Sequence, residues 1–169
     1  MPGAVAVAVV MVHWDGTPVQ IAWCGDARAY RRGGGAAGRR GGDGIVHRVT
    51  TDHNARQDAL DRGLPGASRN KVLSFVGDPH PSPRFGVRAE PAEGRFLLAS
   101  DGAYEPIEDM GCDLWVHLDG PLDEVAEDFA AFAAAAGGAD ADNATVIVID
   151  LSPGSSDDHQ LPHLGVPRV

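Results

Sequence analysis

Two aspartates, Asp101 and Asp142, lie next to apolar runs, at positions where a carboxylate could bind a divalent cation. Asp101 follows the apolar run Phe96–Ala99 and precedes Gly102, where the backbone can turn sharply and approach a ligand. Asp142 precedes a Val- and Ile-rich run that ends at Leu151. Carboxylates on rigid supports are the oxygen donors that Mg²⁺ and Mn²⁺ prefer. Each segment alone favours an ordinary turn. The two carboxylates can share a cation only if their strands are neighbours.

Two further segments contain polar residues at the end of an apolar stretch. Residues 25–30 read GDARAY and residues 51–54 read TDHN, and each alone is an ordinary turn. Taken in order with LLASDG at 97–102 and DNATVIVI at 142–149, they resemble the type-2C (PPM-type) protein serine/threonine phosphatase family. The C-terminal region of that family typically reads GDSRAY, a DH pair, SDG after an apolar strand, and DN before a Val-rich strand. The resemblance spans roughly residues 4–151, and Ala27 replaces the usual Ser.

The resemblance implies a metal-dependent hydrolase. Asp101 and Asp142 match aspartates that bind one metal of a binuclear Mg²⁺ or Mn²⁺ centre in the family. In the implied mechanism, a water that bridges the two cations attacks the phosphorus of a phosphoserine or phosphothreonine. The cations offset the charge on the departing phosphoryl group. The remaining motif matches look structural in this resemblance: Gly25, Asp26, Arg28, Asp52 and His53.

The sequence departs from the family pattern at its N-terminus. The family places a phosphate-binding Arg, an acidic metal-site residue and a DGxGG loop before the strand that Val5–Val12 resembles, and nothing here matches them. Asp15-Gly16 follows that strand and lacks the next two glycines. We therefore expect a partial type-2C fold that lacks the N-terminal strands and first helix. Two lone carboxylates should bind Mg²⁺ weakly, since that ion gives up its water reluctantly.

The pattern of elements predicts an α+β fold with mainly antiparallel β-sandwich layers flanked by helices. A short helix is expected over Ala55–Arg62, with Thr51 or Asp52 as its N-cap, and a long helix over Leu122–Ala136. Apolar or alternating runs predict strands over residues 4–12, 19–24, 29–32, 45–49, 71–76, 84–88, 95–100 and 144–151.

The composition predicts one domain and a tail. Residues 1–151 would form the phosphatase-like domain, and residues 152–169, rich in Pro, Ser, Gly and Asp, a disordered acidic tail. The net charge is −10, and one of the 14 Lys and Arg residues lies beyond residue 100, which argues against nucleic-acid binding. No apolar run is long enough to cross a membrane, and the two cysteines favour a reducing cytoplasm.

Three functions remain open on the sequence. The first is a type-2C phosphatase that hydrolyses a phosphoprotein substrate, supported by the presence of both Asp101 and Asp142. The second is an inactive pseudophosphatase that binds phosphoproteins or a Ser/Thr kinase partner, supported by the absence of the Arg and of the DGxGG loop. The third is a gene remnant without function.

Overall fold

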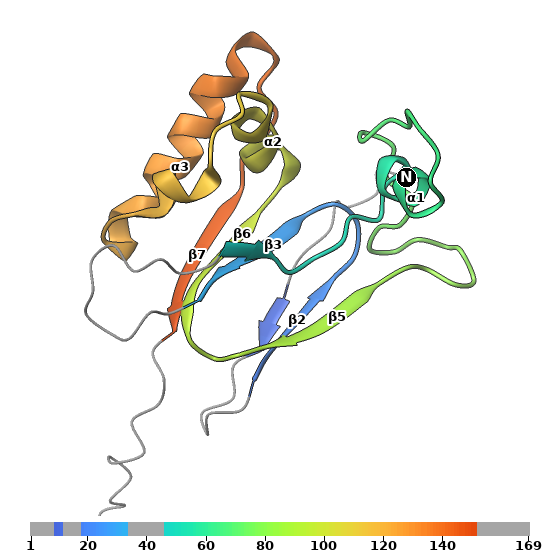
Figure 1. Ribbon diagram of the computed structural model, residues 1–169, viewed down its shortest axis with the longest axis horizontal. Helices are drawn as coiled ribbons and strands as arrows, with labels where there is room; N and C mark the ends of the chain where they lie inside the picture. The colour runs from blue at the N-terminus through green and yellow to red at the C-terminus, as the bar shows by residue number, and fades with distance from the viewer. Residues whose placement is uncertain (1–8, 12–17, 34–45, 152–169) are drawn as a thin grey trace, which may run out of the picture.

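The computed structural model describes residues 9–11, 18–33 and 46–151, which form two antiparallel sheets and the helices packed on them (Figure 1). The first sheet has the order β1-β2-β5 and the second has the order β4-β3-β6-β7. In chain order the elements are β1 (Val9–Met11), β2 (Val19–Trp23), β3 (Arg28–Arg32), β4 (Val46–Arg48), α1 (Ala55–Asp61), β5 (Gly86–Glu90), β6 (Gly94–Ala99), α2 (Asp101–Asp109), the 3₁₀ helix η1 (Leu114–Leu118), α3 (Leu122–Gly137), the 3₁₀ helix η2 (Gly138–Asp140) and β7 (Val146–Leu151).

Strand β6 is the centre of the fold because both of its faces are covered. Phe96 and Leu98 point between the two sheets, where they pack with β2 side chains such as Ile21. Leu97 and Ala99 point to the opposite face, toward the helices. A strand covered on both faces needs apolar residues at consecutive positions, which explains the unbroken run at 96–99. In contrast, β2 alternates between buried and half-buried residues.

Helices α2 and α3 cover the outer face of the second sheet (Figure 1). In α3, Val125, Phe129 and Ala133 are buried and follow one another at intervals of four residues, so they form one stripe along the helix. That stripe packs with Tyr104 and Ile107 of α2 in a shared core. Among the described residues, no helix is long and apolar enough to span a membrane.

The α+β prediction with antiparallel sheets is confirmed, two local predictions are wrong, and one helix was not predicted. The segment 71–76 makes one isolated bridge, between Asn54 and Val72, and no strand. The N-cap of α1 is Asn54, whose Oδ1 accepts a hydrogen bond from the Gln57 N–H, because Asp52 is held elsewhere by an arginine. The sequence analysis did not predict α2, since Asp-Gly and Pro106 indicate a turn there.

Several other predictions cannot be compared with the structure. The N-terminal strand prediction at residues 4–8 and 12, the Asp15-Gly16 turn, and the tail at 152–169 lie outside the described residues.

The packing of α3 leads to a stability prediction. Phe129 is fully buried, so Phe129→Ala should lower the free energy of unfolding by about 3–5 kcal/mol. Phe85 is 74% exposed, and Phe85→Ala should change it by less than about 0.5 kcal/mol. Urea unfolding monitored by circular dichroism measures both values. Equal losses in the two variants would contradict this assignment of the core.

Candidate functional site

The end of β6 and the start of β7 lie side by side and are joined by hydrogen bonds. Ala99 pairs with Val146, and beyond this pair the Ser100 N–H donates to the Thr145 carbonyl oxygen at 3.0 Å. The Ser100 hydroxyl donates to the Asn143 carbonyl oxygen at 3.1 Å and accepts from the Thr145 N–H at 2.9 Å. One serine side chain therefore joins the loop that carries Asp101 to the loop that carries Asp142.

The two loops approach so closely that residue 102 has no room for a side chain. A Cβ on Gly102 would lie 2.7 Å from the Asn143 carbonyl oxygen. On either side of this contact, the Asp101 Oδ1 accepts from the Gly102 N–H at 2.9 Å, and the Asp142 Oδ1 accepts from the Asn143 N–H at 2.7 Å. The structure thus brings both predicted loops to one edge of the sheet. Asp101 is also the first residue of α2, where the helix dipole favours an anion.

A third carboxyl group, that of Asp26, belongs to the turn between β2 and β3. Its side chain is 3% exposed, and its Oδ1 has no hydrogen-bond partner in the structure. Burial raises the pKa of this carboxyl group, and the charge of nearby Asp101 raises it further. Asp26 therefore lies close enough to Asp101 for their charges to interact. A buried carboxyl oxygen without a partner is costly unless a proton or a cation satisfies it.

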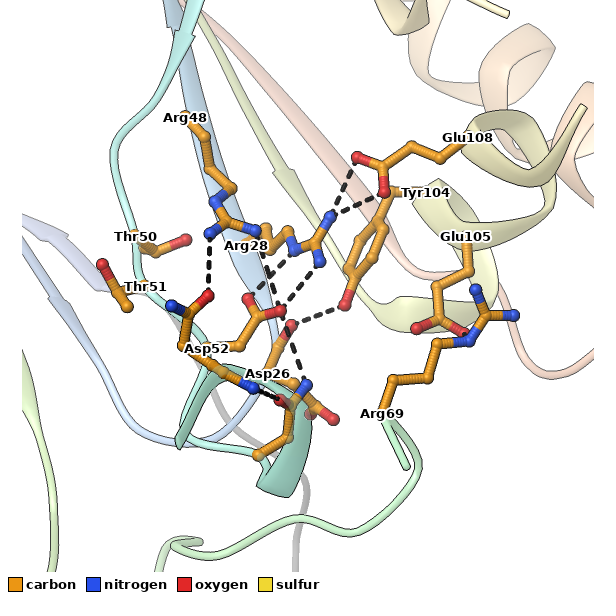
Figure 2. Close-up of polar contacts among 12 residues, drawn as sticks. Asp26, Arg28, Arg48, Thr50, Thr51, Asp52, Arg69, Tyr104, Glu105 and Glu108 are labelled. Atoms are coloured by element: carbon orange, nitrogen blue, oxygen red, sulfur yellow. Dashed lines mark hydrogen bonds and ion pairs between the residues drawn. The ribbon is translucent and has the colours of Figure 1, made fainter. Parts of the chain in front are cut away.

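Arg28 connects this turn to α2 (Figure 2). Its guanidinium donates to both oxygens of Asp52, at 3.0 and 2.8 Å, and to both oxygens of Glu108, at 2.9 and 2.8 Å. It also lies over the Tyr104 ring, 3.9 Å from the centroid. The Tyr104 hydroxyl in turn donates to the Asp26 carbonyl oxygen at 3.0 Å. Burial disfavours the charged guanidinium, but the hydrogen bonds to Asp52 and the interactions with Tyr30 and Tyr104 together outweigh this effect and raise the pKa of Arg28.

His53 holds the backbone just before Asp26. The Gly25 N–H donates to the His53 Nδ1 at 3.2 Å, and the His53 N–H donates to the Gly25 carbonyl oxygen at 2.8 Å. Gly25 has a φ of 97°, a conformation that favours glycine. Burial lowers the pKa of His53, and the charge of Arg84 adds to this. Arg28, Asp52, His53 and Gly25 therefore have the structural roles that the sequence analysis expected.

Glu105 lies one turn of α2 beyond Asp101. Burial raises its pKa, and the charge of Asp101 contributes, while Arg69 opposes the shift. Arg69 forms an ion pair with Glu105, with Nε 3.1 Å from a carboxylate oxygen, and makes two hydrogen bonds to Asp109. Within the described ranges, no three His, Cys, Asp or Glu side chains are arranged so that they could hold a metal ion by themselves. The carboxylates thus share a region without forming a complete cage.

Solved structures resemble this chain over most of its described length. It shares 26% identity and a TM-score of 0.65 with the Mycobacterium tuberculosis serine/threonine phosphatase PstP/Ppp, covering 85% of this chain and 58% of that one. With the catalytic domain of PstP in complex with two manganese ions, it shares 25% identity and a TM-score of 0.63, covering 85% of this chain and 57% of that one. The chain is therefore similar to type-2C, or PPM-type, serine/threonine phosphatases, the family that its sequence motifs resemble.

Other comparisons agree on this fold or find no match. The Mycobacterium smegmatis phosphatase MsPP, solved in complex with cacodylate, has a TM-score of 0.63 at 24% identity, covering 86% of this chain and 61% of that one. No protein-family model and no curated protein sequence matches the chain. The chain spans less than two thirds of the length of these solved structures.

Asp101 and Asp142 were the predicted metal ligands, and Asp26 was not among them because its motif match looked structural. In the structure, the Asp26 carbonyl oxygen accepts a hydrogen bond from Tyr104, three residues beyond Asp101, and one carboxyl oxygen of Asp26 is unpaired. A signal was present in the sequence, because Asp26 follows an apolar strand and precedes the next one, as Asp101 follows β6. The burial of Asp26, which separates it from an ordinary turn residue, could not be read from the sequence.

The close approach of the two loops leads to a prediction for Gly102. Gly102→Ala should lower the free energy of unfolding by about 1–3 kcal/mol, because the neighbouring atoms belong to the backbone and would have to move. In a helix without this contact, the same change would stabilise by about 1 kcal/mol. Urea unfolding distinguishes the two outcomes, and a stabilised variant would show that the loops are not packed together.

The bond between Gly25 and His53 leads to a pH prediction. The unprotonated Nδ1 accepts this bond, and the pKa of His53 is lowered from its ordinary value near 6.5. The unfolded chain therefore takes up the proton more readily. This contribution to stability is complete above about pH 6.5 and is lost as the pH falls below it.

The comparison is with His53→Asn, whose side-chain oxygen can accept the same bond without titrating in this range. Between pH 7 and 5, the native chain should lose more of its free energy of unfolding than the variant loses, as measured by urea unfolding. Other titratable groups contribute equally to the pH dependence of the free energy of unfolding in both proteins. Parallel pH profiles would contradict the role of the neutral imidazole.

Proposed function

We propose that the chain uses Asp26, Asp101 and Asp142 to bind a divalent cation for the hydrolysis of phosphoserine or phosphothreonine in proteins. The observation that carries the proposal is the junction of β6 and β7, where Ser100 joins the two aspartate loops. A bound Mg²⁺ or Mn²⁺ would activate water and offset the negative charge of the phosphoryl oxygens. The manganese ions in the PstP catalytic domain support a cation of this kind.

The residues of the site suit a hard cation. All three proposed ligands are carboxylates, the donor type that Mg²⁺ and Mn²⁺ prefer. The unpaired oxygen of Asp26 is a position where a cation would supply the missing partner. A cation would also relieve the repulsion that raises the pKa of Asp26 beside Asp101. Mg²⁺ usually keeps several waters and needs one or two carboxylates together with substrate phosphate, so an incomplete cage of protein ligands is compatible with binding.

The parts of the chain around these carboxylates determine their arrangement. The backbone N–H groups of Gly102 and Asn143 each bind one oxygen of the preceding aspartate and so orient the carboxylate. Asp101 is also the first residue of α2, where the helix dipole attracts negative charge. Because the sequence contains no DGxGG loop, we expect weaker cation binding and slower turnover than a site with that loop would have.

A second candidate function is a pseudophosphatase that binds a phosphoprotein or a Ser/Thr kinase without hydrolysis. One observation favours it: the part of the chain that the structure describes holds no group of three ligating side chains ready to bind a metal ion. The two functions differ in a direct measurement. A phosphopeptide that binds without release of phosphate in the presence of Mn²⁺ would support the second function over the first.

Single-residue variants test the proposed cation site. Asp101→Asn and Asp142→Asn should each weaken Mn²⁺ binding by about tenfold or more, because each removes one charged donor. Isothermal titration with Mn²⁺ measures the affinity, and phosphate release from a phosphopeptide measures turnover. Asp123→Asn, an exposed acid in the first turn of α3, is the matched control and should leave both unchanged. Equal Mn²⁺ affinities for all four proteins would disprove the site.

A further inference from the structure

We propose that Arg28 is a positioning residue that sets the distance between the carboxylates of Asp26 and Asp101. The inference rests on the proposed cation site and adds a residue that does not touch the cation. Arg28 lies two residues after Asp26 in the chain, and it contacts the helix that begins at Asp101 (Figure 2). It therefore connects the two segments that supply these candidate ligands.

The hydrogen bonds of Arg28 require the shape of a guanidinium. Nε and Nη2 bind the two oxygens of Asp52, while Nη1 faces Glu108 on the other side. The side chain of Arg28 is 12% exposed, so water can replace few of the hydrogen bonds that its N–H groups donate. A planar fork with five N–H donors can hold two carboxylates in fixed directions, whereas the ammonium group of lysine has no such geometry.

On the α2 side, Arg28 reaches one face of the helix at two points. Tyr104 and Glu108 follow Asp101 by three and seven residues, so the three side chains lie on the same face. The guanidinium lies over the Tyr104 ring and binds both oxygens of Glu108. A shift of this helix face away from β3 would break both contacts. Arg28 thus fixes where the first turn of α2, with Asp101, lies.

On the side of the turn between β2 and β3, the partners of Arg28 connect it to the backbone around Asp26. The Tyr104 hydroxyl is buried and donates to the Asp26 carbonyl oxygen at 3.0 Å. Asp52, the other partner of Arg28, is adjacent to His53, which binds the backbone of Gly25 in both directions. The backbone of Asp26 is therefore held by Tyr104, a partner of Arg28, and the backbone of Gly25 by His53, the neighbour of its partner Asp52. The Oδ1 of Asp26 has no hydrogen-bond partner.

This arrangement matters because the two carboxylates repel each other. The Tyr104 hydroxyl, three residues beyond Asp101, reaches the Asp26 carbonyl oxygen at 3.0 Å, so the turn and the start of α2 lie side by side. Without support, the turn and the helix would move apart, and a cation would have to bring them together on binding. A residue that holds them close before binding therefore increases the affinity for the cation. Arg28 has this effect without being a ligand.

A second arginine offers a matched control. Arg95 lies at the opposite end of β6 and binds both oxygens of Asp150 and the carbonyl oxygen of Leu118. Its side chain is 16% exposed, similar to that of Arg28, and its partners are remote from Asp26 in the hydrogen-bond network. Substitution of Arg95 removes a pair of hydrogen bonds to one carboxylate, and substitution of Arg28 removes such pairs to two. The Arg28 substitution alone alters the contacts next to the cation site.

The experiment measures Mn²⁺ affinity by isothermal titration for the native chain and for Arg28→Lys, Tyr104→Phe and Arg95→Lys. Thermal unfolding without metal is measured in parallel, and each titration is made well below the midpoint of unfolding. Arg28→Lys should raise the Kd for Mn²⁺ by about 10- to 100-fold, the usual effect of losing a partner that orients ligands. Tyr104→Phe should raise it severalfold, and Arg95→Lys should leave it within about twofold.

Each outcome either supports the inference or overturns it. If Arg28→Lys binds Mn²⁺ as tightly as the native chain does, or if Arg28→Lys and Arg95→Lys weaken binding equally, Arg28 is not a positioning residue. If Arg28→Lys does not fold, Tyr104→Phe decides, and unchanged affinity in that variant overturns the proposal. If the native chain binds no Mn²⁺, the proposed cation site is wrong, and the role of Arg28 is wrong with it. Binding that survives Arg28→Lys overturns the positioning role alone.

Discussion

The antiparallel pairing of β6 with β7 is the interaction on which the candidate site depends. The pairing runs from Gly94–Leu151 at one end to Ala99–Val146 at the other. In such a pair the end of one strand meets the start of the next. The residues after β6 and those before β7 must therefore meet at one edge. Ser100 extends this contact past the last strand pair, and Gly102 allows the two backbones to touch.

The pairing is stable because β6 lies between two apolar layers. Side chains of β2 cover one face, and α2 and α3 cover the other. A strand held on both sides cannot slip by one residue without turning Phe96 and Leu98 toward the helices and Leu97 toward the other sheet. Packing far from the site thus determines which residues reach the sheet edge. The buried core sets the position of Asp101, and the polar residues at the edge set its orientation.

Elements with a regular apolar pattern could be predicted from the sequence, whereas an element stabilised by tertiary contacts could not. The strands near 19–24, 29–32, 95–100 and 144–151 and the long helix were predictable, because their apolar patterns are regular and match the layers that cover them. Helix α2 was not, because Asp101-Gly102 and Pro106 are typical of turns, and its stability comes from packing against α3. Tertiary contacts outweighed local preference there.

The candidate site could likewise be predicted only in part. The sequence placed Asp101 and Asp142 at strand ends, but it could not show that the strands are neighbours. The predicted N-cap of α1 was Thr51 or Asp52, and this prediction is wrong. The structure assigns the cap to Asn54, because Asp52 binds Arg28 from β3, a partner 24 residues away. A long-range ion pair of this kind leaves no local pattern in the sequence.

The uneven distribution of charge along the chain also has a structural explanation. The arginines of the first 100 residues contact acids of the later part: Arg28 binds Glu108, Arg69 binds Asp109, and Arg95 binds Asp150. These pairs neutralise much of the acidic second half where it contacts the first. The acidic partners in these pairs are 40%, 55% and 42% exposed, and ion pairs that reach solvent add little to stability, so their main consequence is electrostatic.

The acids at the sheet edge are an exception to this pattern. Asp101 and Asp142 form no ion pair with any of the residues that the structure describes, although arginines neutralise Glu105 and Glu108 on the same helix as Asp101. Asp26 also lacks an ion pair there, and one of its oxygens is buried without a partner. Negative charge is therefore left uncompensated at the place where β6 and β7 meet. A divalent cation bound there would neutralise this charge with the donors already present, which is why we assign the function to this edge of the sheet.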